Sequence, residues 1–191
     1  MEMSDNLQQR LKEETAELHS QSEQHPLMQS FVDGSFKKEH LLEVLINLLP
    51  IYQVVEQRLI ALDILNNPEL KRSTYIQKDI DKLITEIGLG KRKIRGVTLN
   101  WLSFAWQKKI SLLKTDLYLR WLADFYGGRI LAKSQAPYNE TYKSENPMAV
   151  ITTVRYILDK DLGKVTNDEI VEHTKDFFLY HINLFEEIWT S

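Results

Sequence analysis

The amino-acid sequence predicts an all-α fold in a single domain that spans residues 1–191. Apolar residues recur every three or four positions along nearly the whole chain, which is the spacing of one helix face. Only seven glycines and five prolines interrupt this pattern, and no segment alternates apolar and polar residues as a half-buried strand does. A chain of this length can build one full hydrophobic core, and no linker or repeat suggests a second domain.

The first half of the chain is expected to form four helices. The first carries a stripe of apolar residues and should end before Pro26, and the Asp33-Gly34 pair ends a short second helix. Pro50 lies inside the long third helix, where the missing backbone hydrogen bond should produce a kink. Gly88 ends the fourth helix. The expected ranges of the last three are 27–32, 37–63 and 68–87.

Four more helices are expected in the second half. The second of these contains the Gly127-Gly128 pair, and two adjacent glycines should bend it. Pro147 at a first turn, and Thr166-Asn167 ahead of two acidic residues, are start signals for the last two helices. The expected ranges are 99–113, 115–135, 147–159 and 167–189, with a polar connection over 137–146.

The composition excludes several classes of site. The chain has no cysteine, which rules out disulfides, thiolate nucleophiles, iron–sulfur clusters and thiolate-ligated heme. Hydrophobic residues make up 43% of the chain and charged residues 27%, as is ordinary for a globular protein. The net charge of -3 gives no reason to expect a nucleic-acid partner. Without cysteine, histidine nitrogens and carboxylate oxygens are the remaining side-chain ligands for a transition metal.

No membrane anchor is expected. Residues 1–10 are polar apart from isolated positions such as Leu7, so they do not resemble a signal peptide. No run of about 18 apolar residues occurs in the chain. These observations predict a cytoplasmic protein.

The segment 121–131, WLADFYGGRIL, places an acid and two glycines inside an apolar helix. At about 100° per residue, Asp124 falls on the same face as Trp121 and Gly128. Each glycine inside a helix costs about 1 kcal/mol relative to alanine. The pattern fits either a kinked core helix, in which Asp124 pairs with Arg120 one turn earlier, or a helix that lies against something flat.

Four blocks of the chain resemble heme oxygenases, in chain order. YLRWLADFYGGRIL over 118–131 is similar to the distal helix of that family, and LKEETAELHSQSEQHPLMQSF over 11–31 is similar to its proximal helix. The other two blocks are IYQVVE over 51–56 and FFLYHINLFEEI over 177–188. The resemblance is weakest in the middle third of the chain. It implies a multihelical fold that holds heme between a proximal helix and a kinked distal helix.

The resemblance implies the activity of a heme oxygenase of the soluble bacterial type. Heme would be both the substrate and the cofactor that activates dioxygen, and the products would be biliverdin, carbon monoxide and ferrous iron. An electron donor, either a reductase or a ferredoxin-type protein, is the implied partner. His19 stands at the position of the axial iron ligand, and Glu23 one turn later can hydrogen-bond the other ring nitrogen.

Further site residues are implied on both sides of the heme. Asp124 would organise distal water, within a network to which Tyr52, Tyr118 and Arg120 correspond. The implied heme contacts are Lys12 and Arg155 at the propionates, and Gly127, Gly128, Phe178 and His181 in the pocket. Without the resemblance, the two cations read as solvated side chains, the aromatic residues as core, and His181 as a core histidine.

The chain departs from the family pattern at four positions. Ala123 replaces a glycine before the distal acid, and Tyr126 replaces a small residue before the glycine pair. These two changes make a non-catalytic heme carrier or sensor on the same fold the alternative function. Ala16 and Ile151 replace basic residues, which leaves the seating of the heme, and hence the meso carbon that is attacked, open.

Two other classes of all-helical enzyme fit less well. A thiaminase-like site needs a cysteine nucleophile, and the chain has none. A carboxylate-bridged di-iron site needs Glu-x-x-His pairs. The residues three positions before the five histidines are Ala, Ser, Lys, Ile and Phe, so no such pair exists.

A basic run, KRKIR over 91–95, is accompanied by Lys108, Lys109 and Lys114. Such a cluster is usually a solvated loop, but it can also form a docking face for an acidic electron donor. It lacks the interleaved aromatic residues and the motifs of a nucleic-acid site.

Overall fold

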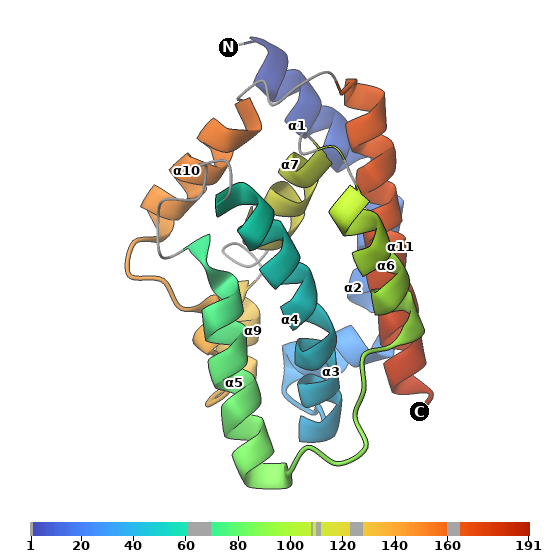
Figure 1. Cartoon of the computed structure of the whole chain (residues 1–191), viewed down its shortest axis with the longest axis vertical. Helices are drawn as coiled ribbons and strands as arrows, with labels where there is room; N and C mark the ends of the chain where they lie inside the picture. The colour runs from blue at the N-terminus through green and yellow to red at the C-terminus, as the bar shows by residue number, and fades with distance from the viewer. Residues whose placement is uncertain (1, 61–69, 108, 110–111, 123–127, 160–164) are drawn as a thin grey trace.

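Every regular element in the described part of the chain is helical (Figure 1). The structure is a computed structural model that describes residues 2–60, 70–107, 109, 112–122, 128–159 and 165–191. No strand occurs within these ranges, which confirms the predicted all-α class.

The N-terminal segment forms two helices where the sequence predicts one. α1 (Glu2–Glu14) and α2 (Ala16–Gln24) meet at Thr15, whose hydroxyl donates to the carbonyl oxygen of Leu11 at 2.6 Å. A threonine that bonds back onto the preceding turn tends to bend a helix. The break leaves His19 near the middle of α2.

α3 (Pro26–Asp33) matches the predicted short helix to within one residue at each end. Nδ1 of His25 accepts from the backbone N–H of Leu27 at 3.1 Å and caps its first turn. Gly34, with a φ of 79°, ends it in the left-handed conformation that glycine adopts without strain. Because Nε2 of His25 also lies 3.2 Å from Oε2 of Glu186, this histidine is occupied by structural contacts.

Three longer helices follow, and several predicted boundaries change. α4 (Lys38–Ile60) contains Pro50 as predicted, and α5 (Arg72–Ile87) ends at Gly88. The predicted end at 63 lies outside the described residues. The predicted start at 68 is wrong, because Lys71 is not helical and α5 begins only at Arg72. α6 (Gly96–Gln107) begins three residues before the predicted start, and its predicted extension to 113 is wrong, because Lys109 is not helical.

The predicted helix over 115–135 is not one continuous α-helix. α7 (Leu113–Asp116) leads directly into η3 (Leu117–Leu122), which is a π-helix, and α9 (Gly128–Ser134) follows. Residues 123–127 lie outside the described part, so the predicted bend there is not tested. Leu119, Arg120 and Trp121 are all buried. The wider π turn rotates less per residue than an α-helix and so keeps three consecutive side chains inside.

The last two helices, α10 (Pro147–Asp159) and α11 (Asn167–Trp189), match their predicted ranges. Thr166 and Glu169 form a capping box at the start of α11, with Thr166 N–H donating to Glu169 at 2.8 Å and Glu169 N–H donating to the Thr166 hydroxyl at 3.2 Å. The predicted polar connection before α10 contains one 3₁₀ turn, η4 (Glu140–Tyr142).

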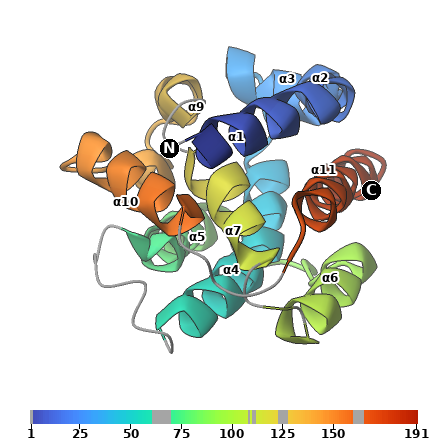
Figure 2. The same ribbon diagram turned by 90° about the horizontal axis from the view of Figure 1, so that it is seen from above.

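α11 is the helix against which most of the other helices pack. It packs against α1, α2, α3, α4, α6 and α7, while α4 also packs against α5 and α6 (Figure 1). Seen from above, α7 lies near the middle, with α10, α6, α11 and α1 around it (Figure 2). Leu42 and Val55 of α4 and Leu184 of α11 are among the fully buried residues of the core. None of the described helices combines the length and apolar character needed to cross a membrane.

Asp79 and Gly128 fix the turn after α9. The buried carboxylate of Asp79 on α5 accepts from the backbone N–H groups of Glu140 and Thr141 at 3.0 and 2.8 Å. This anchors η4, and the ring of Tyr142 lies against Gly128. A Cβ added at Gly128 would lie 2.5 Å from Cδ1 of that ring, so the packing requires glycine here.

Gly128→Ala should therefore lower the free energy of unfolding by about 1 to 3 kcal/mol, the usual cost of overpacking. Urea unfolding of wild type, Gly128→Ala, Tyr142→Ala and the double variant measures this. The double variant should be less destabilised than the sum of the single variants, because removing the ring relieves the clash. Strict additivity would show that Gly128 and Tyr142 do not constrain each other.

Candidate functional site

His19 presents its imidazole at the surface of α2. The side chain is 55% exposed, and Nδ1 lies 3.5 Å from Oε2 of Glu23, which is within ion-pair range but is not the expected hydrogen bond. The ring meets that of Phe178 on α11 edge-on, with 5.6 Å between the centroids. Nε2 has no hydrogen-bond partner among the described residues. The fold thus brings together His19 and Phe178, two residues expected near heme.

His181 is a neutral imidazole among aromatic rings. Burial, and then repulsion by Arg120, lower its pKa to about 3. Nδ1 lies 2.9 Å from the carbonyl oxygen of Phe177, and because a carbonyl only accepts, Nδ1 carries the proton. The ring lies 4.3 Å from that of Phe177 and 5.0 Å from that of Tyr180. Nε2 is left as a lone-pair acceptor.

Arg120 is a buried cation inside an aromatic cage. Its Cζ lies 4.1 Å from the ring centroid of Phe177, 5.1 Å from that of Tyr52 and 5.6 Å from that of Trp101. A desolvated cation over an aromatic face gains about 2 kcal/mol or more. Nε and Nη2 have no hydrogen-bond partner within the described ranges, so two donors remain for a ligand or water.

Tyr52 and Arg120, expected in one network, are therefore in contact. The buried ring of Tyr52 also lies 5.0 Å from that of Trp121, whose indole N–H donates to the carbonyl oxygen of Leu70 at 2.8 Å. The backbone of Tyr118 belongs to η3, but its side chain lies outside the described part. Asp124, Gly127, Ala123 and Tyr126 also lie outside the described residues.

Sequence reasoning missed a polar network near Arg120. The hydroxyl of Tyr180 lies 3.0 Å from Oγ1 of Thr98, which donates to Oδ1 of Asn47 at 2.9 Å. The backbone N–H of Arg95 donates to the same oxygen at 2.7 Å. Burial raises the pKa of Tyr180 to about 12, which keeps its hydroxyl protonated. The one available signal was Asn47, a lone polar residue on an otherwise apolar stretch of α4.

A second buried polar pair was also missed. Asp116, at the end of α7, is fully buried, and His173 on α11 is 4% exposed. Oδ2 of Asp116 and Nε2 of His173 are 3.5 Å apart. The signal in the sequence is weak, since it consists of an acid next to apolar positions and a histidine one turn before Phe177.

The remaining expected heme contacts stay predictions. Lys12 is exposed in the last turn of α1, and Arg155 is exposed on α10. Such exposure fits a propionate partner and a solvated cation equally. Gly128 is buried, but the direction of its missing Cβ faces Tyr142, so packing alone accounts for this glycine.

Part of the basic cluster has internal partners. Arg95 binds the carboxylate of Glu43 through Nε at 2.6 Å, and Arg92 donates to the carbonyl oxygen of Leu89 at 2.7 Å. Lys109 lies 3.5 Å from Glu169. Lys91 and Lys93 are exposed, whereas Lys108 and the side chain of Lys114 lie outside the described part. The cluster is therefore less available for docking than its sequence suggests.

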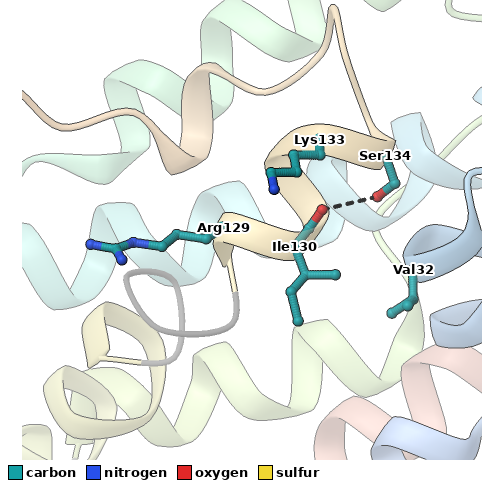
Figure 3. Close-up of a pocket in the computed structure, with 5 residues that line it drawn as sticks. All are labelled: Val32, Arg129, Ile130, Lys133 and Ser134. Atoms are coloured by element: carbon teal, nitrogen blue, oxygen red, sulfur yellow. Dashed lines mark hydrogen bonds between the residues drawn. The ribbon is translucent and has the colours of Figure 1, made fainter.

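A surface hollow of about 460 Å³ lies between α3 and α9 (Figure 3). Figure 3 shows its α9 residues on one side and Val32 of α3 on the other. The lining residues are Val32, Arg129, Ile130, Lys133 and Ser134. None of the expected heme-site residues is among them, although Arg129 directly follows Gly128 in the chain.

The described residues fit a heme. An imidazole with an unoccupied ring nitrogen can bind iron, and Nε2 of His19 has no partner among the described residues. Phe178 contacts the ring of His19, and the preceding residue, Phe177, lies against the guanidinium of Arg120. His181, with its acceptor nitrogen, follows three residues after Phe178 on α11. Adjacent residues of α11 therefore contact His19 and Arg120.

The fold matches solved heme oxygenases. Heme oxygenase-1 from the cyanobacterium Synechocystis sp. PCC 6803 in complex with heme superposes with a TM-score of 0.81, 23% identity, and coverage of 95% of this chain and 91% of that chain. A heme oxygenase from Leptospira interrogans gives a TM-score of 0.80 and 22% identity over 95% of this chain and 98% of its own.

Sequence comparison agrees. The chain is 24% identical to heme oxygenase 1 of Synechocystis over 97% of this chain and 86% of that protein. It is 23% identical to heme oxygenase 1 of Gallus gallus over 97% of this chain and 71% of that protein. The model of the heme oxygenase family matches residues 5–187, which is nearly the whole chain. The protein is therefore an enzyme of the heme oxygenase family.

Proposed function

We propose that this enzyme cleaves heme to biliverdin, carbon monoxide and ferrous iron with dioxygen and reducing equivalents, and that His19 is the axial iron ligand. The observation that carries the proposal is the state of His19, which is half-exposed, contacts Glu23 through Nδ1 and leaves Nε2 without a described partner. The Synechocystis enzyme, whose fold this chain shares, is a complex with heme, which supports a heme site in this fold. We place that site between α2 and the segment from η3 to α9, as the resemblance of these segments to the proximal and distal helices implies.

Glu23 has a defined part in this arrangement. A carboxylate close to Nδ1 would favour the tautomer that is protonated there and would leave Nε2 available to bind the heme iron. A single histidine ligand leaves the opposite face of the heme open to dioxygen. The heme supplies the oxygen-activating chemistry, and Phe178 supports the imidazole from α11.

On the distal side, Asp124 is proposed to organise water together with Tyr52, Tyr118 and Arg120. A carboxylate that acts through ordered water can deliver a proton without touching the iron. Arg120 has two donors without described partners, and His181 has a neutral acceptor nitrogen. Water in this region would therefore find hydrogen-bond partners of both kinds.

The periphery of the site completes the proposal. Lys12 and Arg155 would pair with the heme propionates, because cations neutralise carboxylates most strongly at a partly dry pocket mouth. Gly127, Gly128 and Phe178 would lie against the porphyrin. The electron donor, a reductase or a ferredoxin-type protein, would use the exposed Lys91 and Lys93 as part of its docking face.

One experiment tests the proposed function directly. Hemin is added to the purified protein, ascorbate or a reductase system supplies electrons, and the Soret band is followed while pigment is extracted. Loss of the band with formation of a bilin supports the oxygenase. A stable reduced heme spectrum would show a carrier or sensor instead.

His19→Ala should leave the helical content unchanged and abolish turnover, because it removes the protein ligand but no buried contact of the core. Resonance Raman spectra of the ferrous complex should lose the histidine–iron vibration. His40→Ala is the matched control, since His40 packs against Trp189 on the other end of the fold. A histidine–iron signature that persists in His19→Ala would assign the ligand to another histidine.

Asp124→Ala should bind heme with the histidine–iron vibration intact, yet produce biliverdin about 100-fold more slowly, the usual scale of a general acid–base contribution. Bilin extraction and the Soret decay give both quantities. Asp81→Ala, at an exposed position of α5, serves as the control for loss of one carboxylate. Biliverdin formation at the wild-type rate would show that Asp124 is not needed for turnover and would leave it the role of an ion-pair partner of Arg120.

Heme affinity of the Gly128 and Tyr142 variants separates two roles of this glycine. If Gly128 only makes room for Tyr142, Gly128→Ala/Tyr142→Ala regains heme affinity together with stability. If its backbone also lies against the porphyrin, as proposed, affinity stays low although stability recovers.

A further inference from the structure

Two opposite charges on the distal segment are buried and yet do not pair. Asp116 ends α7, and Arg120 lies four residues later in η3. An acid and a base at this spacing are neighbours on an ordinary helix and normally form an ion pair. Here neither carboxylate oxygen of Asp116 has a hydrogen-bond partner among the described residues, and the same holds for Nε and Nη2 of Arg120.

α11 holds the two charges at separate points. Nε2 of His173 lies 3.5 Å from Oδ2 of Asp116, and one turn later the ring centroid of Phe177 lies 4.1 Å from Cζ of Arg120. Nε2 of His173 lies within ion-pair range of the carboxylate without a hydrogen bond to it, whereas the ring of Phe177 presents its negative face to the guanidinium. Each charge thus meets the α11 residue whose chemistry suits it.

The π-helical turn contributes to the separation. Residues four apart stack on the same face of an α-helix, but a π-helix closes its hydrogen bonds one residue later and shifts them out of register. η3 begins directly after Asp116, so the shift occurs between the two charged residues. The shift alone does not keep the two groups apart, because a flexible guanidinium and a carboxylate attract each other strongly when both are buried. A further contact to one of them is therefore needed.

We propose that His173 is a positioning residue, which holds the carboxylate of Asp116 away from Arg120 and so keeps the guanidinium donors free. With Asp116 held near His173, Arg120 retains its positive charge and two donor nitrogens, Nε and Nη2, without a described partner. If Asp116 turned to Arg120 instead, the pair would neutralise the cation and occupy those groups. The inference rests on the proposed function in one respect only, which is that the donors of Arg120 act on the distal side of the heme.

The test follows Arg120 in the heme-free protein. In ¹⁵N-edited NMR spectra, His173→Leu should shift the Nε–H resonance of Arg120 and slow its exchange with water, because Asp116 now accepts from it. His173→Gln, which keeps a side-chain donor for Asp116, should resemble wild type. The double variant Asp116→Asn/His173→Leu should also resemble wild type, because the competing carboxylate is gone.

These variants separate positioning from mere structural support. A purely structural role of His173 predicts that the double variant is at least as perturbed as His173→Leu, which would overturn the proposal. An unchanged Arg120 resonance in His173→Leu would overturn it as well. If His173→Leu does not fold, His173→Asn replaces it, because the shorter side chain cannot reach Asp116. An unchanged Arg120 resonance in this variant, or a double variant with Asp116→Asn that is perturbed at least as much, would again overturn the proposal.

The hemin-loaded proteins provide a second readout. Fluoride binding to ferric heme benefits from nearby hydrogen-bond donors, so His173→Leu should bind fluoride about tenfold more weakly, and Asp116→Asn/His173→Leu should recover the wild-type affinity. A loss that persists in the double variant would contradict the proposal. If wild-type protein binds no hemin, the proposed function fails, while the comparison of Arg120 resonances in the heme-free protein still decides the role of His173.

Discussion

Burial of the Arg120 guanidinium is the constraint on which the centre of this structure depends. Removing such a charge from water costs several kcal/mol even after relaxation. Ring faces from Tyr52 on α4, Trp101 on α6 and Phe177 on α11 surround it and offset part of that cost. Three helices must therefore converge on one side chain of η3. The aromatic rings offer no hydrogen-bond acceptor, so Nε and Nη2 of Arg120 have no described partner and are available to bind a ligand or water.

α11 connects the two sides of the proposed heme site through adjacent residues. Phe177 lies against Arg120, and Phe178 lies against His19. Consecutive side chains of a helix point about 100° apart, so one rigid element can contact two different partners at fixed spacing. The relation between His19 and Arg120 is thus set by a helix with a capped start and a buried inner face, rather than by loops.

Helix boundaries could be predicted where the signal is local, and not where it depends on packing. The ranges of α10 and α11 follow from Pro147 and from the capping box at Thr166, which act within one turn. The break at Thr15 depends on a side-chain bond to Leu11, and the π-helical turn of η3 on the burial of three consecutive side chains. Neither effect changes the three- and four-residue spacing of apolar residues that periodicity detects.

The sequence by itself determined the all-α class, most helices, the family and the candidate iron ligand, because these depend on periodicity and on motifs carried by short segments. Only the tertiary structure decided that Gly128 faces Tyr142, that Tyr52 and Trp101 enclose Arg120, and that Asp116 meets His173. Periodicity reports which face of a helix is buried but not what it is buried against. Partners that lie tens of residues apart in the chain are selected by how the helices pack, and that packing is a property of the whole core.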